Sequence, residues 1–151
     1  MKYLLLLMLP IFYACKDNNQ KTQKDNTKIV QKFDTVKTAV DNNDSIIYLK
    51  INARDLPKTV KLSILHNYQK VFIEIADVHE HKIQGSITVN ERNRNIRFNQ
   101  IKMPDGSTDG PFGLNISYTT RQKGNYTLII GKDNMADGIL KGNATVSLIL
   151  Q

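Results

Sequence analysis

The sequence is poor in the residues that build catalytic and cross-linked sites: its 151 residues include one cysteine, three histidines and no tryptophan. A single cysteine excludes a disulfide within the chain, so packing and sheet hydrogen bonds must hold the fold. The absence of tryptophan argues against a carbohydrate site built on stacking. There is no G-x-S-x-G nucleophile elbow and no phosphate-binding loop, and the carboxylates are scattered. These absences favour a binding protein over an enzyme.

The only cysteine follows a short apolar run at the N-terminus. Residues 4–13 are apolar, and a run of about ten residues is too short to span a membrane but has the length of a signal-peptide core. The junction Ala14-Cys15 resembles the lipobox of bacterial lipoproteins, in which the cysteine is acylated and becomes the N-terminus. This resemblance implies a signal peptide over residues 1–14 and a lipidated Cys15. A general secretory signal is the alternative.

The residues after Cys15 predict where the protein is held. Lys16 differs from the aspartate typical of retention at the inner membrane, which favours an outer-membrane lipoprotein. The domain would then face the periplasm or the cell surface, and the sequence leaves both open. Residues 16–28 contain no apolar side chain, so residues 15–28 are predicted to form a flexible tether that carries the lipid.

The formal net charge of +7 restricts the partners. Basic proteins bind nucleic acids, anionic polymers or acidic protein surfaces. Nucleic acid is disfavoured outside the cytoplasm, which leaves an envelope polymer or an acidic protein. A solvated lysine-rich surface without any partner would explain the charge as well.

Hydrophobic periodicity assigns residues 29–151 to one all-β domain. Apolar residues of segment 29–40 are spaced as on a helix, yet many are β-branched, so a helix and an edge strand both fit. From residue 45 onward the period is two, in about eight short segments separated by Asn, Asp, Gly and Pro clusters. These segments are 47–51, 60–64, 71–75, 83–89, 96–101, 114–118, 126–130 and 146–150. The pattern predicts an antiparallel β-sandwich or jelly roll, with a bulge at Gly85.

Two short motifs contain metal-ligand residue types. His79-Glu80-His81 would place two imidazoles on one face of a strand, but no further ligand is near in sequence, and a solvated hairpin fits equally. Asp105 and Asp109 resemble the start of a calcium loop, but Ile116 stands where the bidentate glutamate belongs. Two consecutive turns explain these aspartates without an ion. The sequence predicts no metal or cofactor, and it leaves calcium binding at Asp105 and Asp109 open.

The C-terminal half carries a recognisable succession of motifs. A strand with Phe98-Asn99 leads to the turn Pro104-Asp105-Gly106; Lys123-Gly124-Asn125-Tyr126 starts a strand, and Asn134-Met135-Ala136-Asp137-Gly138 precedes the last strand. This succession resembles a family of small secreted β-sandwich proteins that includes the periplasmic inhibitors of goose-type and invertebrate-type lysozymes. That family is similar in turn to the pre-peptidase C-terminal domain.

The resemblance implies a binding function without catalysis. In the inhibitors the stretch before the Gly-x-Tyr strand begins with serine and enters the lysozyme cleft, and Lys123 stands in place of that serine here. The predicted partner-binding residues are Lys123, Gly124, Tyr126, Lys132, Asn134 and Tyr118. A structural role is the alternative for two of them: Gly124 permits a turn, and Tyr126 packs at the start of a strand with its hydroxyl bonded to a neighbouring carbonyl. The partner would be a lysozyme or another envelope protein. The alternative is a structural or accessory lipoprotein of an envelope assembly.

Overall fold

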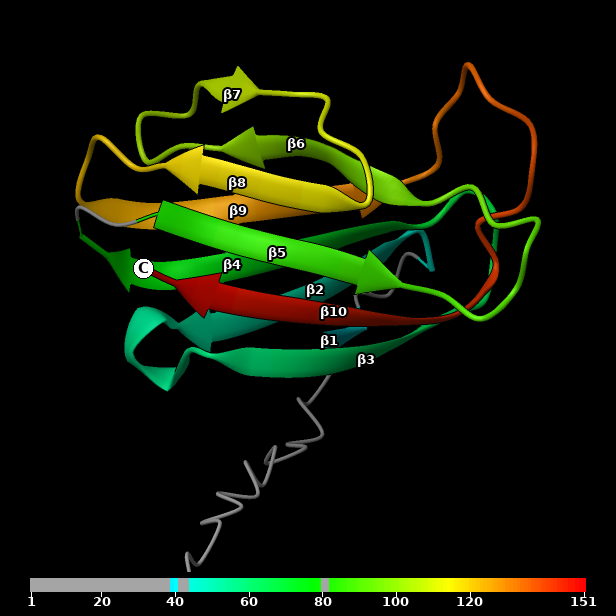
Figure 1. Cartoon of the computed structure of the whole chain (residues 1–151), viewed down its shortest axis with the longest axis horizontal. Helices are drawn as coiled ribbons and strands as arrows, with labels where there is room; N and C mark the ends of the chain where they lie inside the picture. The colour runs from blue at the N-terminus through cyan, green and yellow to red at the C-terminus, as the bar shows by residue number, and fades with distance from the viewer. Residues whose placement is uncertain (1–38, 41–43, 80–81) are drawn as a thin grey trace, which may run out of the picture.

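The computed structural model describes residues 39–40, 44–79 and 82–151 (Figure 1). The predictions of a signal peptide, an acylated Cys15 and a tether fall outside these residues, as do Glu80 and His81. Most of the segment 29–40 also lies outside them. None of the helices in the described part of the chain is long and apolar enough to cross a membrane.

The described residues form an all-β fold, as the sequence predicts. The strands are β1 (Ala39–Val40), β2 (Ile46–Asn52), β3 (Lys58–Ile64), β4 (Lys70–Val78), β5 (Lys82–Thr88), β6 (Arg97–Lys102), β7 (Thr108–Asp109), β8 (Asn115–Thr119), β9 (Gly124–Gly131) and β10 (Gly142–Leu150). One short 3-10 helix, η1 (Ala53–Asp55), follows β2. Each of the eight predicted segments corresponds to a strand. The additional β1 and β7 have two residues each, too few to show a period in sequence.

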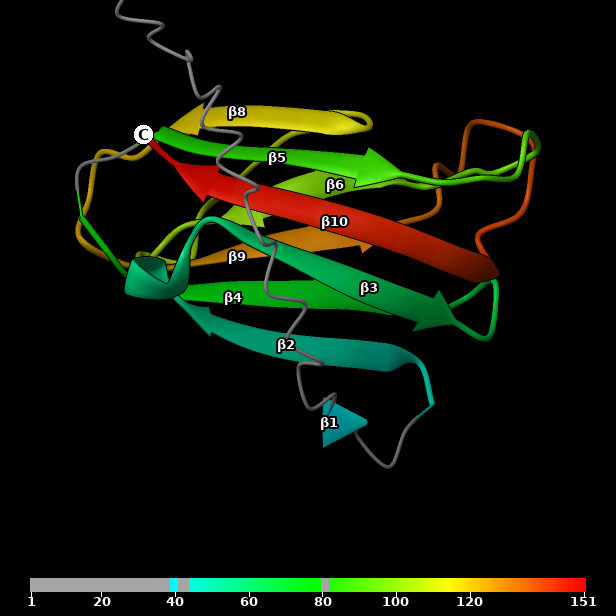
Figure 2. The same cartoon turned by 60° about the horizontal axis from the view of Figure 1, so that its bottom comes forward.

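Two sheets pack into a sandwich (Figure 2). The larger has the order β1-β2-β4-β9-β6-β7 and the smaller the order β3-β10-β5-β8. Neighbouring strands are antiparallel except for β2 and β4, which are parallel. The exception arises because the chain leaves β2, forms β3 in the opposite sheet and returns to β4, so β2 and β4 run in one direction. The predicted sandwich is therefore confirmed as a mostly antiparallel one.

The core is made by the inward-facing alternate residues of both sheets. Phe98 and Tyr126 are the largest side chains that are less than 2% exposed, and every buried apolar residue of the core cluster lies between Ile47 and Leu148. A chain that begins at Lys16 keeps all of these described core residues.

Gly85 has a different role from the one predicted. The pairing of β5 continues without interruption through Gly85, opposite Leu148 on one side and Ile116 on the other. A Cβ at this position would lie 3.1 Å from Cζ of Phe98 and 2.8 Å from Cδ2 of Leu148. The predicted bulge is therefore wrong: the glycine makes room for the Phe98 ring. The register shifts lie instead between Phe98 and Gln100 and between Ile75 and Val78.

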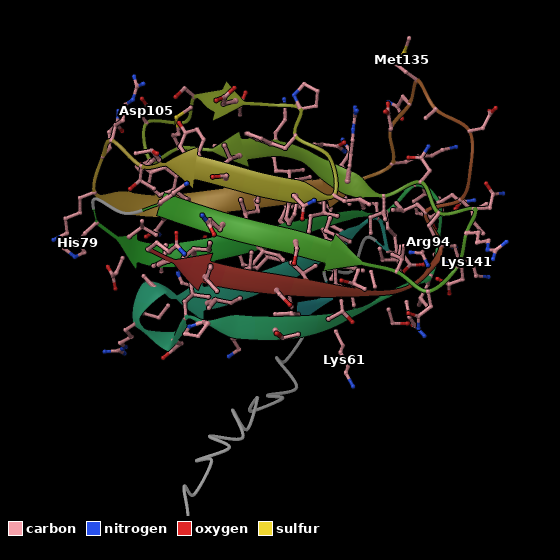
Figure 3. All side chains as sticks on the ribbon, in the orientation of Figure 1. Lys61, His79, Arg94, Asp105, Met135 and Lys141 are labelled. Carbon is pink, nitrogen blue, oxygen red and sulfur yellow. The ribbon has the colours of Figure 1, made fainter. Side chains whose placement is uncertain are left out.

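The loops that surround the predicted partner-binding residues lie at the two ends of the sandwich (Figure 3). One end carries the β6–β7 turn (residues 103–107), with Asp105, and the β8–β9 loop (residues 120–123). The opposite end carries the β9–β10 excursion (residues 132–141), with Met135 at its projecting tip.

Candidate functional site

The six predicted partner-binding residues do not form one surface. Tyr118, Lys123, Gly124 and Tyr126 belong to β8, the β8–β9 loop and the start of β9, whereas Lys132 and Asn134 follow the end of β9 (Figure 1). β9 has eight residues, and at about 3.3 Å per residue it separates the two groups by about 25 Å. The structure therefore divides the prediction into two candidate surfaces at opposite ends.

The side chain of Tyr126 belongs to the core. It is 1% exposed. The hydroxyl donates a hydrogen bond to the carbonyl oxygen of Gln122 (2.8 Å) and accepts one from the backbone N–H of the same residue (3.2 Å). This is the packing role that the sequence also allowed for Tyr126, with its hydroxyl bonded to a nearby carbonyl; contact with a partner stays a prediction. The physical role of Tyr126 is to fasten the β8–β9 loop to the core.

Gly124 closes the other side of this loop. Its φ of +146° is one that side-chain-bearing residues rarely adopt, and a Cβ would lie 2.8 Å from Cβ and Cγ of Pro104. The β8–β9 loop thus rests directly on the β6–β7 turn. This close approach requires glycine at position 124.

Asp105 ties the turn and the loop together. Its carboxylate accepts hydrogen bonds from the hydroxyl and the backbone N–H of Ser107 and from Nε2 of Gln122 (3.1 Å). The bonds from Ser107, and then that from Gln122, hold the pKa of Asp105 below its ordinary value. Asp105 is therefore an anion at neutral pH.

Within the described residues, no group of three or more His, Cys, Asp or Glu side chains could hold a metal ion.

The fastened loop presents two cations to solvent. Arg121 and Lys123 are exposed on either side of Gln122, whose backbone is held by Tyr126. Lys123 was predicted from the sequence, and Arg121 was not. The pattern Arg121-Gln122-Lys123, with two basic residues around a glutamine in a polar connection, could have indicated both. A loop that is already ordered loses little conformational entropy when it binds.

A groove of about 780 Å³ lies beside this loop. Its apolar lining comes from Met103, Phe112, Tyr118 and Tyr126. The Tyr118 ring meets Phe112 edge-on, with centroids 6.5 Å apart, and its hydroxyl donates to Sδ of Met103 (2.8 Å). Burial raises the pKa of Tyr118 above its ordinary value. Tyr118, a predicted contact residue, is half-buried and is accessible from the groove.

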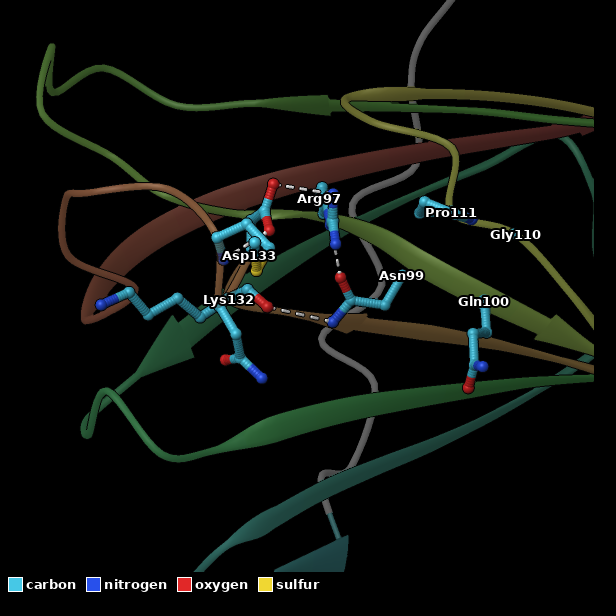
Figure 4. Close-up of a pocket in the computed structure, with 9 residues that line it drawn as sticks. Arg97, Asn99, Gln100, Gly110, Pro111, Lys132 and Asp133 are labelled. Carbon is cyan, nitrogen blue, oxygen red and sulfur yellow. Dashed lines mark hydrogen bonds and ion pairs between the residues drawn. The ribbon is translucent and has the colours of Figure 1, made fainter.

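The opposite end has its own cleft, of about 360 Å³, beside the β9–β10 excursion (Figure 4). Lys132 and Asn134 both line it. Arg97 also lines this cleft. Its Nη1 lies 2.7 Å from Oδ2 of Asp133, and its Nε donates a hydrogen bond to Oδ1 of Asn99 (2.8 Å). Arg97 is thus already paired with Asp133, and Lys132 is the other cation that lines this cleft.

The excursion is anchored by residues that the sequence analysis missed. Asn95 is buried, and its Nδ2 donates to the carbonyl oxygens of Asp133 (2.9 Å) and Ala136 (2.7 Å). Its Oδ1 accepts from the backbone N–H of Asp133 (2.7 Å). Nη2 of Arg94 donates to the carbonyl oxygen of Leu140 (2.7 Å). No sequence signal distinguishes these two residues from the other polar residues around them.

The His79-Glu80-His81 motif lies only partly within the described residues. His79 is exposed at the end of β4, and the other two residues of the motif lie outside the described part of the chain.

Replacing Tyr126 by phenylalanine tests the fastening of the loop. The ring keeps its packing, but the two hydrogen bonds to Gln122 are lost, so we expect the free energy of unfolding to fall by about 1 kcal/mol. We also expect faster hydrogen exchange at the amide of Gln122, measured by NMR. The control is Tyr118→Phe, which loses only the bond to Met103. Equal exchange in both variants would contradict the fastening role.

Fold and loop together define the chain as a small β-sandwich with an ordered, basic loop at one end. It is similar in structure to PliG of Aeromonas hydrophila, a periplasmic inhibitor of g-type lysozyme, with a TM-score of 0.52 and 10% identity, over 71% of this chain and 98% of that chain. The pre-peptidase C-terminal domain of a collagenase from Bacillus anthracis gives a TM-score of 0.42 and 17% identity, over 67% and 93%. No family model and no curated protein matches the chain. The likeness to the inhibitor confirms the resemblance predicted from the sequence at the level of the fold.

Proposed function

We propose that this chain is a non-catalytic protein of the bacterial cell envelope that inhibits a lysozyme with its β8–β9 loop. The observation that carries the proposal is the loop itself: Arg121 and Lys123 are exposed on a backbone fixed by Tyr126 and Gly124. Lysozyme clefts contain catalytic carboxylates, so a basic loop complements them. The similar fold of a periplasmic lysozyme inhibitor supports the proposal.

The lysis of bacterial cell walls tests this function. The chain from Lys16 to Gln151 would be mixed with goose-type, invertebrate-type and chicken-type lysozymes at low and moderate salt. We expect stoichiometric inhibition of one class, weakened by salt because charged groups steer the encounter. The double variant Arg121→Ala/Lys123→Ala should inhibit at least about tenfold less well, because it loses charge-assisted contacts.

The matched control removes the same number of charges at the other end. Lys132→Ala/Lys141→Ala changes the net charge equally, and we expect it to inhibit within about threefold of the parent chain. A larger loss in this control than in the loop variant would move the site to the excursion. Inhibition of no class at micromolar protein would overturn the proposed function.

The membrane anchor is a separate part of the proposal. We infer that Cys15 carries the lipid that holds the protein at the outer membrane, from the apolar run and the Ala14-Cys15 junction. Cells that express the full chain should incorporate labelled palmitate into it, and Cys15→Ser should abolish the label. A chain that is secreted without any label would instead support a general secretory signal.

A structural role in an envelope assembly is the second candidate. Large apolar side chains are exposed at the end opposite the loop, among them Met135 (93%) and Tyr68 (61%). The turn that carries Tyr68 is joined to the excursion, since Oδ1 of Asn67 accepts from the backbone N–H of Leu140 and of Lys141 (both 2.9 Å). These side chains therefore belong to neighbouring segments, as expected for a surface that docks onto another protein.

A further inference from the structure

The two sheets have four edge strands, and β8 differs from the other three. β1 and β7 have two residues each, and β3 carries Lys58 and Lys61. Short length and lysine are the usual devices that prevent an edge from pairing with another chain. β8 has five residues and none of them is charged. Figure 2 shows it as the outermost strand of the four-stranded sheet.

The hydrogen bonds of β5 determine which groups of β8 are directed outward. Lys82 exchanges both backbone hydrogen bonds with Gln151, which follows β10, so the alternate residues of β5 bond to β8. Ile83 and Gly85 stand opposite Tyr118 and Ile116. Because bonded and non-bonded pairs alternate along an antiparallel pair, the residues between these point their backbone groups away from β5.

The outward groups belong to Ser117 and Thr119. The side chains of both residues are exposed, and both residues line the groove beside the β8–β9 loop. Their N–H and C=O groups have no hydrogen-bond partner among the residues that the structure describes. The groove therefore offers a row of two donors and two acceptors along one wall, with aromatic rings within reach.

From this arrangement we propose that the groove binds an extended, uncharged peptide segment, which adds to β8 as a further strand. The unpaired backbone groups would bind its backbone, as in β-strand addition. Phe112 and Tyr118 would pack against an aromatic or aliphatic side chain of the peptide. The volume of about 780 Å³ is within the range of ordinary ligand sites.

The charge and the shape of the groove favour an uncharged peptide over other occupants. The groove is lined by one cation, Arg121, and one carboxylate, Asp109, so it gives no net preference for a charged ligand. β7, with Thr108 and Asp109, forms the wall opposite β8. A single extended strand is a slimmer occupant than the edge of a second sandwich, and a groove bounded by the edge strands of both sheets therefore favours a peptide.

An NMR titration of the labelled chain from Lys16 to Gln151 tests the site. The probe is the capped pentapeptide acetyl-VTYTV-amide, which is uncharged and extended. We expect shifts of the Ser117 and Thr119 amides, with submillimolar affinity. The same peptide with every backbone N–H methylated should bind about tenfold or more weakly, because it loses its donors. Equal binding of both peptides would overturn the proposal.

A pair of proline variants provides the matched control on the protein. Ser117→Pro removes an outward N–H from β8, and Ser63→Pro removes the corresponding outward N–H from the other edge strand, β3. We expect about tenfold weaker binding for Ser117→Pro and no more than about a twofold change for Ser63→Pro. If Ser117→Pro does not fold, the comparison of the methylated with the unmethylated peptide still tests the proposal. Shifts confined to the excursion, no shift at millimolar peptide, or a dimer of the chain that Ser117→Pro dissociates would each overturn the proposal.

The outcome does not depend on the proposed inhibition, because the titration contains no lysozyme.

Discussion

Replacing Phe98 by alanine should lower the free energy of unfolding by about 3–5 kcal/mol, the range found when a buried phenylalanine leaves a cavity. Phe98 is 0% exposed. Its ring lies over Gly85, which has no side chain to fill the space that the ring would leave. Neighbouring strands pair continuously on both sides of Gly85, so the site has little freedom to collapse. Urea denaturation followed by circular dichroism measures the change.

Phe72→Ala is the control for this prediction. Phe72 lies on the outer face of the same sheet, between Tyr48 and Ile129, and is only partly buried. We expect Phe72→Ala to lower the free energy of unfolding by about 1 kcal/mol, because removal of this ring leaves no enclosed cavity. Comparable losses for the two variants would contradict the described core.

Replacing Asn95 by alanine should lower the free energy of unfolding by about 2–4 kcal/mol. The change removes three hydrogen bonds of a buried amide, and each contributes about 0.5–1.5 kcal/mol. Two of them hold the backbone of Asp133 and one that of Ala136. We therefore also expect faster hydrogen exchange at the amides of the β9–β10 excursion, while the β8–β9 loop stays protected.

Asn134→Ala provides the comparison within the excursion itself. Asn134 is exposed and makes no side-chain hydrogen bond to any described residue, so the free energy of unfolding should change by no more than about 0.5 kcal/mol. If Asn95→Ala lowered the free energy of unfolding no more than Asn134→Ala does, the excursion would not depend on Asn95.

The strands were predictable because they obey a simple local rule. Alternation of apolar and polar residues depends only on neighbours in sequence, and every predicted segment, from 47–51 to 146–150, coincides with a strand. The parallel pairing of β2 with β4 was not predictable in this way, because it depends on β3 joining the opposite sheet. Gly85 shows the same limit, because the side chains that leave no room for a Cβ there belong to other strands: Leu148, Ile116 and Phe98.

The candidate site was predicted only in part. Lys123 and Gly124 lie in the loop as expected, and both follow from local sequence. The sequence allowed Tyr126 either to pack or to contact a partner, because its burial depends on the closure of the two sheets and not on its neighbours in sequence. Lys132 and Asn134 were grouped with Lys123 because they are near in sequence, although a full strand separates them.

Hydrogen exchange of the complex is the most direct test of the proposal that the β8–β9 loop occupies a lysozyme cleft. The chain from Lys16 to Gln151 would be mixed with the lysozyme that it inhibits, and backbone hydrogen exchange would be followed by mass spectrometry. We expect new protection at residues 120–124 and none at residues 132–141. Protection of the excursion alone, or no complex with any class of lysozyme, would contradict it.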